Sequence, residues 1–182
     1  MSVIVVEFVT LDGVAEDPDG SAGTATGGWA FRHGPEAVAG DKFRLGALLD
    51  TGVLLLGRTT WELFAKLWPG RSGEFPDRLN NAAKLVASRT LDDVSAWQNS
   101  SLLQGDLVAA VKREERDVIV IGSIGIAREL AGHDLVDEYR LLVFPTVAGA
   151  GRRLFDGTPP ADLRLVSTTR SGAAVLSTYR TH

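Results

Sequence analysis

Short runs of β-branched and aliphatic residues alternate along this chain with segments in which apolar residues recur at helical spacing. The runs predict strands over 3–9, 53–56, 84–87, 117–121 and 138–144. The helical spacing predicts helices over 35–50, 59–67, 102–114 and 124–131, with Thr59 as an N-cap. Such alternation is typical of an α/β fold, in which helices cover both faces of a mostly parallel sheet.

The last part of the chain follows a different pattern. Two strands are expected over 163–168 and 173–179, joined by a short turn that contains Ser171 and Gly172. The predicted architecture is therefore a three-layer α/β fold whose central sheet ends in an antiparallel hairpin. A chain of 182 residues is expected to form a single domain, 1–182.

Composition limits the classes of partner. A formal net charge of −4 argues against electrostatic binding of nucleic acid or of an anionic membrane over an extended surface. A small-molecule substrate is therefore expected. The chain has no cysteine, which excludes disulfides and thiolate sites, and its histidines lack ligand spacing, so no metal site is predicted. No secretory leader or membrane span is apparent, and a cytoplasmic protein is expected.

Two long loops stand out, over 11–34 and 68–75. The first is rich in Gly, Asp and Thr, and the second contains Pro69 and Gly70. Loops of this length in compact domains often act as lids or binding loops, although a plain surface excursion is the alternative.

The most informative motif runs from Leu54 to Glu62, where an apolar strand ends in Gly57 and is followed by Arg58, Thr59 and Thr60 at the start of a helix. Backbone N–H groups at a helix start and the guanidinium of an arginine both favour a phosphate. A glycine at the strand end lets the phosphate approach the backbone closely. This segment therefore predicts an anion site.

Two further strand ends carry related patterns. Ser88, Arg89 and Thr90 follow the third strand, and a glycine-flanked turn from Ile121 through Gly122, Ser123 and Ile124 to Gly125 follows the fourth. Ligands of open parallel sheets bind at the carboxyl ends of strands, so these ends together predict one extended ligand. Neither a G-x-G-x-x-G fingerprint nor a Walker phosphate loop is present, and arginine in place of a carboxylate favours the 2′-phosphate of NADPH.

With these motifs the sequence resembles the dihydrofolate-reductase-like superfamily, and within it the reductase domain of the bacterial riboflavin-pathway deaminase-reductase. The segment from Gly57 to Glu62 is similar to the reductase motif G-R-x-T-[WY]-E, whose arginine and threonines hold cofactor phosphates. The resemblance implies that 88–90 contacts the adenosine 2′-phosphate. It also implies that 120–123 leads to a Gly-Gly pair beside the nicotinamide and pyrophosphate.

The sequence departs from the family pattern at two places. Ser123 stands where the second glycine of the pair is expected, so a residue with a side chain must tolerate that backbone. The 68–75 loop lengthens the path between the two phosphate motifs, so the adenine pocket near Ser88 and Thr90 is expected to be shifted relative to the family pattern.

These features predict an NADPH-dependent reductase that transfers a hydride to a pterin-like, pyrimidine-like or ribosylamino compound. The acceptor pocket is expected between the 11–34 loop and the 35–50 helix, with Trp29 lining it or serving only as packing. Asp41, on that helix, is the candidate catalytic acid and substrate ligand, although it could instead cap a helix, with Glu36 or Asp50 in the pocket. The alternative is a catalytically inactive nucleotide-binding module, and the resemblance also suggests a homodimer.

Overall fold

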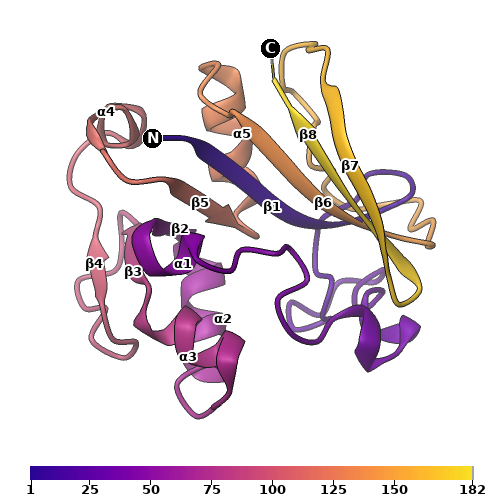
Figure 1. Cartoon of the computed structure of the whole chain (residues 1–182), viewed down its shortest axis with the longest axis horizontal. Helices are drawn as coiled ribbons and strands as arrows, with labels where there is room; N and C mark the ends of the chain where they lie inside the picture. The colour runs from indigo at the N-terminus through magenta and orange to yellow at the C-terminus, as the bar shows by residue number, and fades with distance from the viewer. Residues whose placement is uncertain (182) are drawn as a thin grey trace.

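The computed structural model describes residues 1–181, so the final residue of the predicted domain lies outside the described part. Eight strands form one sheet in the order β4-β3-β2-β5-β1-β6-β8-β7 (Figure 1). Their bounds are Val3–Thr10 (β1), Val53–Gly57 (β2), Ala83–Ala87 (β3), Ser100–Leu102 (β4), Val118–Ile121 (β5), Glu138–Phe144 (β6), Arg164–Ser171 (β7) and Ala174–Arg180 (β8). Pairing is parallel from β4 to β6 and antiparallel from β6 through β8 to β7, as predicted.

Helices cover both faces of the sheet, which confirms the three-layer prediction. On one face, α4 (Leu107–Arg113) and α5 (Ile124–Gly132) bury Val111 and Leu130. On the other face, the short α1 (Leu48–Thr51), α2 (Arg58–Leu67) and α3 (Glu74–Asn81) bury Leu49, Trp61 and Leu79. No helix in the described residues is long and apolar enough to cross a bilayer.

The helix predicted over 35–50 is wrong. The segment holds a 3-10 turn at Pro35–Ala37, which follows another at Phe31–His33, and then an irregular stretch before α1. Gly40, Arg44 and Gly46 all have positive φ angles, between 46° and 74°, and these interrupt any continuous helix. Apolar periodicity was therefore a misleading signal in a segment punctuated by left-handed residues.

Other boundaries also need correction. The helix predicted over 102–114 begins only at Leu107, because the Asp106 side chain accepts a hydrogen bond from the Ala109 N–H and caps it. Leu102, predicted as the start of this helix, is instead the last residue of β4, a strand that was not predicted. The α3 helix, between α2 and β3, was not predicted either. The N-cap of α2 is Gly57 rather than Thr59.

The 11–34 loop is ordered by a buried carboxylate. Asp17 accepts hydrogen bonds from the N–H groups of Ala22 and Thr24 and from the Thr24 hydroxyl, all at 2.8–2.9 Å. These bonds outweigh the opposing effect of burial and lower the pKa of Asp17. The Asp17 carbonyl oxygen also accepts from the N–H groups of Gly20 and Gly28, so one residue fixes both ends of the loop tip.

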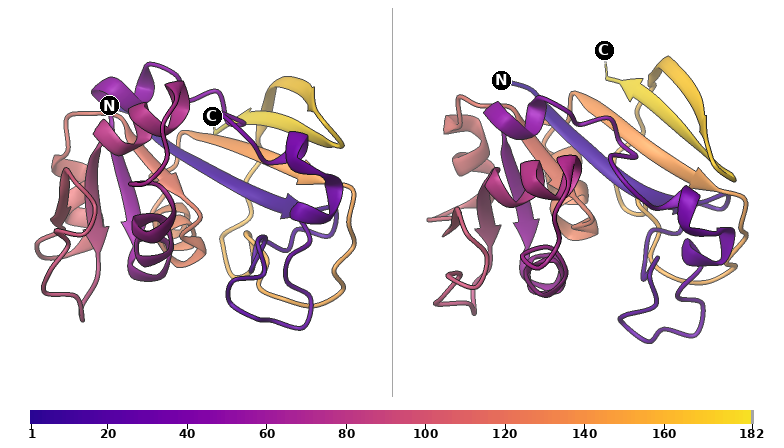
Figure 2. Two further views of the ribbon diagram at one scale, coloured as in Figure 1. Left: turned by 90° about the horizontal axis from the view of Figure 1, so that it is seen from below. Right: turned by 60° about the horizontal axis from the view of Figure 1, so that its bottom comes forward.

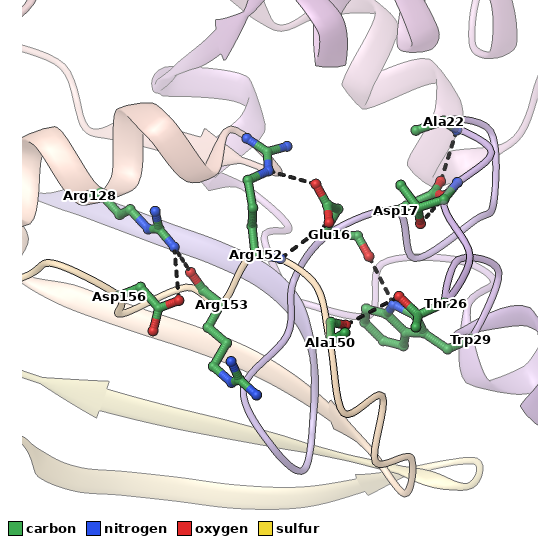
Figure 3. A network of polar contacts seen from close by, with 11 residues as sticks. Glu16, Asp17, Ala22, Thr26, Trp29, Arg128, Ala150, Arg152, Arg153 and Asp156 are labelled. Carbon is green, nitrogen blue, oxygen red and sulfur yellow. Dashed lines mark hydrogen bonds and ion pairs between the residues drawn. The ribbon is translucent and has the colours of Figure 1, made fainter.

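The same loop is fastened to the 145–156 segment, which follows β6. Figure 2 shows the two segments together on one side of the sheet, and Figure 3 shows the contacts between them. Arg152 pairs with Glu16 at 2.7 Å, and the Thr26 hydroxyl donates to the Ala150 carbonyl oxygen at 3.2 Å. Asp12 accepts from the N–H groups of Ala148 and Gly149. The loop is therefore part of the packed structure.

The predicted 68–75 loop is shorter than expected, because α3 begins at Glu74. Trp68 packs edge-on against Phe64 and Phe75, with ring centroids 6.1 Å and 5.6 Å apart, and Arg71 lies over its ring. Trp68 and Phe75, at the two ends of the loop, thus pack against the core that α2 and α3 cover.

The edge of the sheet at β7 is exposed along almost all of its length, including Leu165 and Val166. An exposed strand edge is able to pair with another chain. The homodimer stays a prediction.

Asp17→Ala should lower the free energy of unfolding by about 2 kcal/mol, because it leaves three partly buried donors without their acceptor. It should also expose the loop tip to proteolysis, which limited digestion with mass spectrometry would locate within 18–28. Asp19→Ala is the matched control, because Asp19 accepts only from neighbouring Ser21 in the exposed turn. Equal stability and digestion patterns for the two variants would contradict this role of Asp17.

Candidate functional site

The sheet places the three motif-bearing strand ends side by side. β3, β2 and β5 are consecutive in the sheet and run parallel, so their carboxyl ends lie at one edge. The segments that follow them, 88–90, 57–60 and 121–125, carry the residues predicted to bind the cofactor. Residues far apart in the sequence are thus gathered at the edge where ligands of parallel sheets bind.

β5, which lies between β2 and β1 in the sheet, stops short of both neighbours. Its last residue, Ile121, pairs with Val6 of β1, while β1 continues alongside β6 as far as Thr10. Extending the register with β1 by one residue sets Gly122 level with Glu7, and extending the register with β2 by two residues sets it level with Gly57. The chain turns here into α5, which leaves a notch in the sheet edge between β1 and β2.

Two helix starts border this notch. α2 begins directly after Gly57 and α5 directly after Ser123, and neither has a side chain that caps its first turn. The N–H groups of a first helical turn have no partner within the helix and carry the positive end of its dipole. The two starts therefore offer donors for an anionic ligand.

Ser123 joins the two strand ends. Its hydroxyl oxygen accepts a hydrogen bond from the Gly57 N–H at 2.7 Å and lies 3.3 Å from the Thr60 hydroxyl. Thr60 in turn donates to the Gly122 carbonyl oxygen at 3.3 Å. The family glycine that Ser123 replaces is not needed for its backbone, because the positive φ of +61° falls on Gly122.

The basic residues lie at the exposed end of this edge. Arg58 donates to the Thr90 hydroxyl at 3.3 Å, so the first and second motifs are in direct contact. The Ser88 hydroxyl accepts from the N–H groups of Thr90 and Leu91 and forms the turn that presents Arg89 to solvent. Arg58, Thr59, Arg89 and Thr90 are exposed, and an incoming phosphate could reach them.

Sequence reasoning missed one residue beside the notch, Glu7. Its side chain is 4% exposed, and its Oε2 atom has no hydrogen-bond partner in the part of the chain that the structure describes. Burial raises the pKa of Glu7 to about 8, against a smaller opposing effect of the Phe8 backbone N–H. A lone carboxylate inside an apolar strand was the sequence signal, since charged residues are seldom fully buried without a partner.

Asp41 lies in a turn, so its predicted place on a helix is wrong. Its two carboxylate oxygens accept hydrogen bonds from the N–H groups of Leu45 and Gly46, at 2.8 Å and 2.7 Å. Asp41 thus holds a turn rather than capping a helix, because the next helix, α1, begins only at Leu48. The catalytic role of Asp41 stays a prediction, as do the alternatives Glu36 and Asp50.

Trp29 is fully buried, with its indole N–H donating to the Glu16 carbonyl oxygen at 3.0 Å. Its ring packs edge-on against Phe144, 5.4 Å between centroids. The ring has no exposed surface for a substrate in this structure, so its position matches the packing alternative.

Two cavities lie away from the three strand ends. One of about 540 Å³ is bounded by His33, Glu36 and the β7–β8 turn, beyond β6. Another, of about 490 Å³, lies near the end of α5 against Tyr139 and Phe155. Residues 1–181 contain no group of three or more His, Asp or Glu that could hold a metal ion.

Solved structures share this fold. A putative riboflavin biosynthesis protein from Shewanella sp. PV-4 superposes with a TM-score of 0.75 at 19% identity, over 100% of this chain and 99% of that one. A pyrimidine reductase-like protein from Corynebacterium diphtheriae gives 0.54 at 13% identity, over 100% and 92%.

A longer protein also matches. The diaminohydroxyphosphoribosylaminopyrimidine deaminase/5-amino-6-(5-phosphoribosylamino)uracil reductase of Thermotoga maritima has a TM-score of 0.61 at 18% identity. The match covers all of this chain but 56% of that one. These likenesses establish the dihydrofolate-reductase-like fold.

Sequence comparison agrees with the fold. The uncharacterized protein YyaP of Bacillus subtilis (strain 168) is 27% identical over 185 residues, which cover 96% of this chain and 91% of that protein. The model of the RibD C-terminal domain matches residues 1–177. The chain therefore belongs to the RibD C-terminal domain family.

Proposed function

We propose that this protein is an NADPH-dependent reductase of a small heterocyclic compound. The observation that carries the proposal is the edge formed by β3, β2 and β5, where two uncapped helix starts adjoin two exposed arginines. Family membership supports an oxidoreductase, and the names of the structural relatives include a uracil reductase and a pyrimidine reductase-like protein.

The residues present fit a phosphorylated dinucleotide. The first turns of α2 and α5 would donate to its pyrophosphate, and Gly57 and Gly122 lack side chains where the backbone must approach it. Arg58 and Arg89, with the hydroxyls of Ser88 and Thr90, would hold the 2′-phosphate. The orphaned Oε2 atom of Glu7, level with Gly122, marks a polar position still to be satisfied.

When bound, the cofactor supplies the hydride, and the protein supplies orientation and electrostatics. The helix starts and arginines would neutralise the phosphates, and the flat nicotinamide ring would lie beside Gly122, where β5 ends between β1 and β2. The acceptor would be a pterin-like, pyrimidine-like or ribosylamino compound with an electron-poor C=N or carbonyl carbon.

One observation favours the second candidate, an inactive nucleotide-binding module. Asp41 has both carboxylate oxygens engaged by backbone donors, and Trp29 is buried, so neither substrate-side residue is free. Clear NADPH binding without NADPH oxidation, tested against a broad panel of pterins, pyrimidines and ribosylamino compounds, would favour this module.

NADPH should bind about tenfold more tightly than NADH, because a charge-assisted contact to the 2′-phosphate has this order of magnitude. Arg89→Ala should remove most of the preference, and calorimetric titration with both cofactors measures it. Arg164→Ala, an exposed arginine on β7, is the matched control. Equal affinity for the two cofactors, unchanged in Arg89→Ala, would refute the 2′-phosphate assignment.

Gly122→Val should abolish NADPH binding in a protein that still folds. Gly122 has a φ of +61°, which a β-branched residue rarely adopts, and an added Cβ would lie 3.4 Å from Thr60 Cγ2. Gly122→Ala, a milder change, should weaken binding at least tenfold. Gly132→Ala, at the other end of α5 in open space, is the control. Circular dichroism checks folding, and normal affinity in folded Gly122→Val would exclude this strand end from the site.

Asp41→Asn should slow the hydride step about 10²-fold with little change in NADPH affinity, if Asp41 is the catalytic acid as proposed. Single-turnover kinetics measure this rate. An unaltered rate and pH profile, accompanied by a loss of about 1 kcal/mol in stability, would leave Asp41 as a turn residue alone.

A further inference from the structure

The Glu7 carboxyl, whose Oε2 atom has no hydrogen-bond partner among the described residues, lies in the apolar layer between the sheet and α5. Side chains alternate between the faces of a strand, and Val5 and Val9 belong to the core cluster that α5 covers, so Glu7 faces the same layer. Ile124 and Ala127 of α5 and Leu154 of the 145–156 segment complete that cluster. The layer is apolar, and beyond the backbone N–H of Phe8 it offers a carboxylate nothing to replace its hydration.

Glu7 is close to the start of α5. Neighbouring strands lie roughly 5 Å apart, and Glu7 is level with Gly122, one residue before the N-cap of α5. The Gly122 N–H donates to the Val6 carbonyl oxygen at 3.4 Å, which fixes this alignment. A negative charge on Glu7 and a phosphate at the α5 start would therefore interact through a low-dielectric interior.

The charged groups on the surrounding elements are engaged elsewhere. Arg128 of α5 donates to the carbonyl oxygens of Arg153 and Leu154 and pairs with Asp156. Where the 11–34 loop meets the 145–156 segment, Arg152 pairs with Glu16 (Figure 3). Arg153 of the same segment pairs with Asp12. The titratable residue of β6 on this face is Tyr139, whose pKa burial raises to about 12. The described surroundings thus supply Glu7 with no ion pair.

We propose that Glu7 is a positioning residue whose proton is linked to ligand binding: the α5 start accepts an anionic dinucleotide only while the Glu7 carboxyl is neutral. The proposal rests on the proposed cofactor site. Repulsion between an ionised Glu7 and the ligand phosphates would weaken binding. By linkage, ligand binding would raise the pKa of Glu7.

The direction of the pH effect follows from the pKa of about 8 in the ligand-free protein. Below this pH Glu7 is already neutral and the affinity is constant. Above it each binding event takes up a proton, and the affinity for NADPH should fall about tenfold between pH 7 and pH 9. The 2′-phosphate of NADPH titrates near pH 6 and does not contribute in this range.

Calorimetric titration of NADPH from pH 6.5 to pH 9.5, in buffers of different ionisation enthalpy, measures affinity and proton uptake together. Glu7→Gln should bind with a pH-independent affinity and take up no proton, and Glu7→Leu serves if Glu7→Gln does not fold. Glu129→Gln removes the same charge from an exposed position on α5 and should behave as the wild type. Burial also lowers the pKa of Lys84 to about 8. Lys84 is present in every variant, so its titration does not account for a difference between them.

A ligand-free measurement tests the same carboxyl. Folding raises the pKa of Glu7 from 4.5 to about 8, so its contribution to stability is present below pH 4.5 and is lost as the pH rises to 8. Urea unfolding should therefore show wild type losing stability relative to Glu7→Gln between pH 5 and pH 8. A constant difference across this range would overturn the proposal.

The outcomes separate the two proposals. NADPH binding with the same pH dependence in wild type and Glu7→Gln would overturn the role of Glu7 and leave the proposed function intact. Absence of NADPH binding at every pH would contradict the proposed function, and the titration would then be repeated with inorganic pyrophosphate. A pH dependence for pyrophosphate that Glu7→Gln abolishes would support the role of Glu7, and no pyrophosphate binding would overturn it.

Discussion

The early end of β5 is the constraint on which the rest of this site depends. β5 lies between β1 and β2 and pairs with β1 over only four residues, so both neighbours pass beyond it. The chain must leave the sheet at Gly122, where a φ of +61° turns it directly into α5. That departure sets the start of α5 beside the start of α2, and the Ser123 hydroxyl fastens the two together.

The strand pattern was predictable because its cause is local. Runs such as Val118–Ile121 are apolar on both faces, which only a strand covered by helices on both sides can satisfy. The gathering of Arg58, Arg89 and Gly122 at one edge was predictable too, because parallel strands end at a common edge and glycine or hydroxyl residues mark each exit.

What the sequence could not show depends on contacts between distant residues or on backbone torsions. Positive φ angles at Gly40, Arg44 and Gly46 replace the expected helix, and an apolar pattern carries little information about them. Trp29 is buried because β6 supplies Phe144 opposite it. The burial of Glu7 depends on α5 and on a loop more than 140 residues away along the chain, and local sequence says nothing of that covering.

The central claim is that one ligand lies across the ends of β3, β2 and β5. The most direct test is a crystal structure of the protein with bound NADP⁺, the oxidised form of the cofactor. The account predicts the pyrophosphate within hydrogen-bond distance of the first turns of α2 and α5, the 2′-phosphate beside Arg58 or Arg89, and the nicotinamide next to Gly122. A cofactor bound instead in the cavity beside Tyr139, or in the one beside His33, with the helix starts unoccupied, would contradict it.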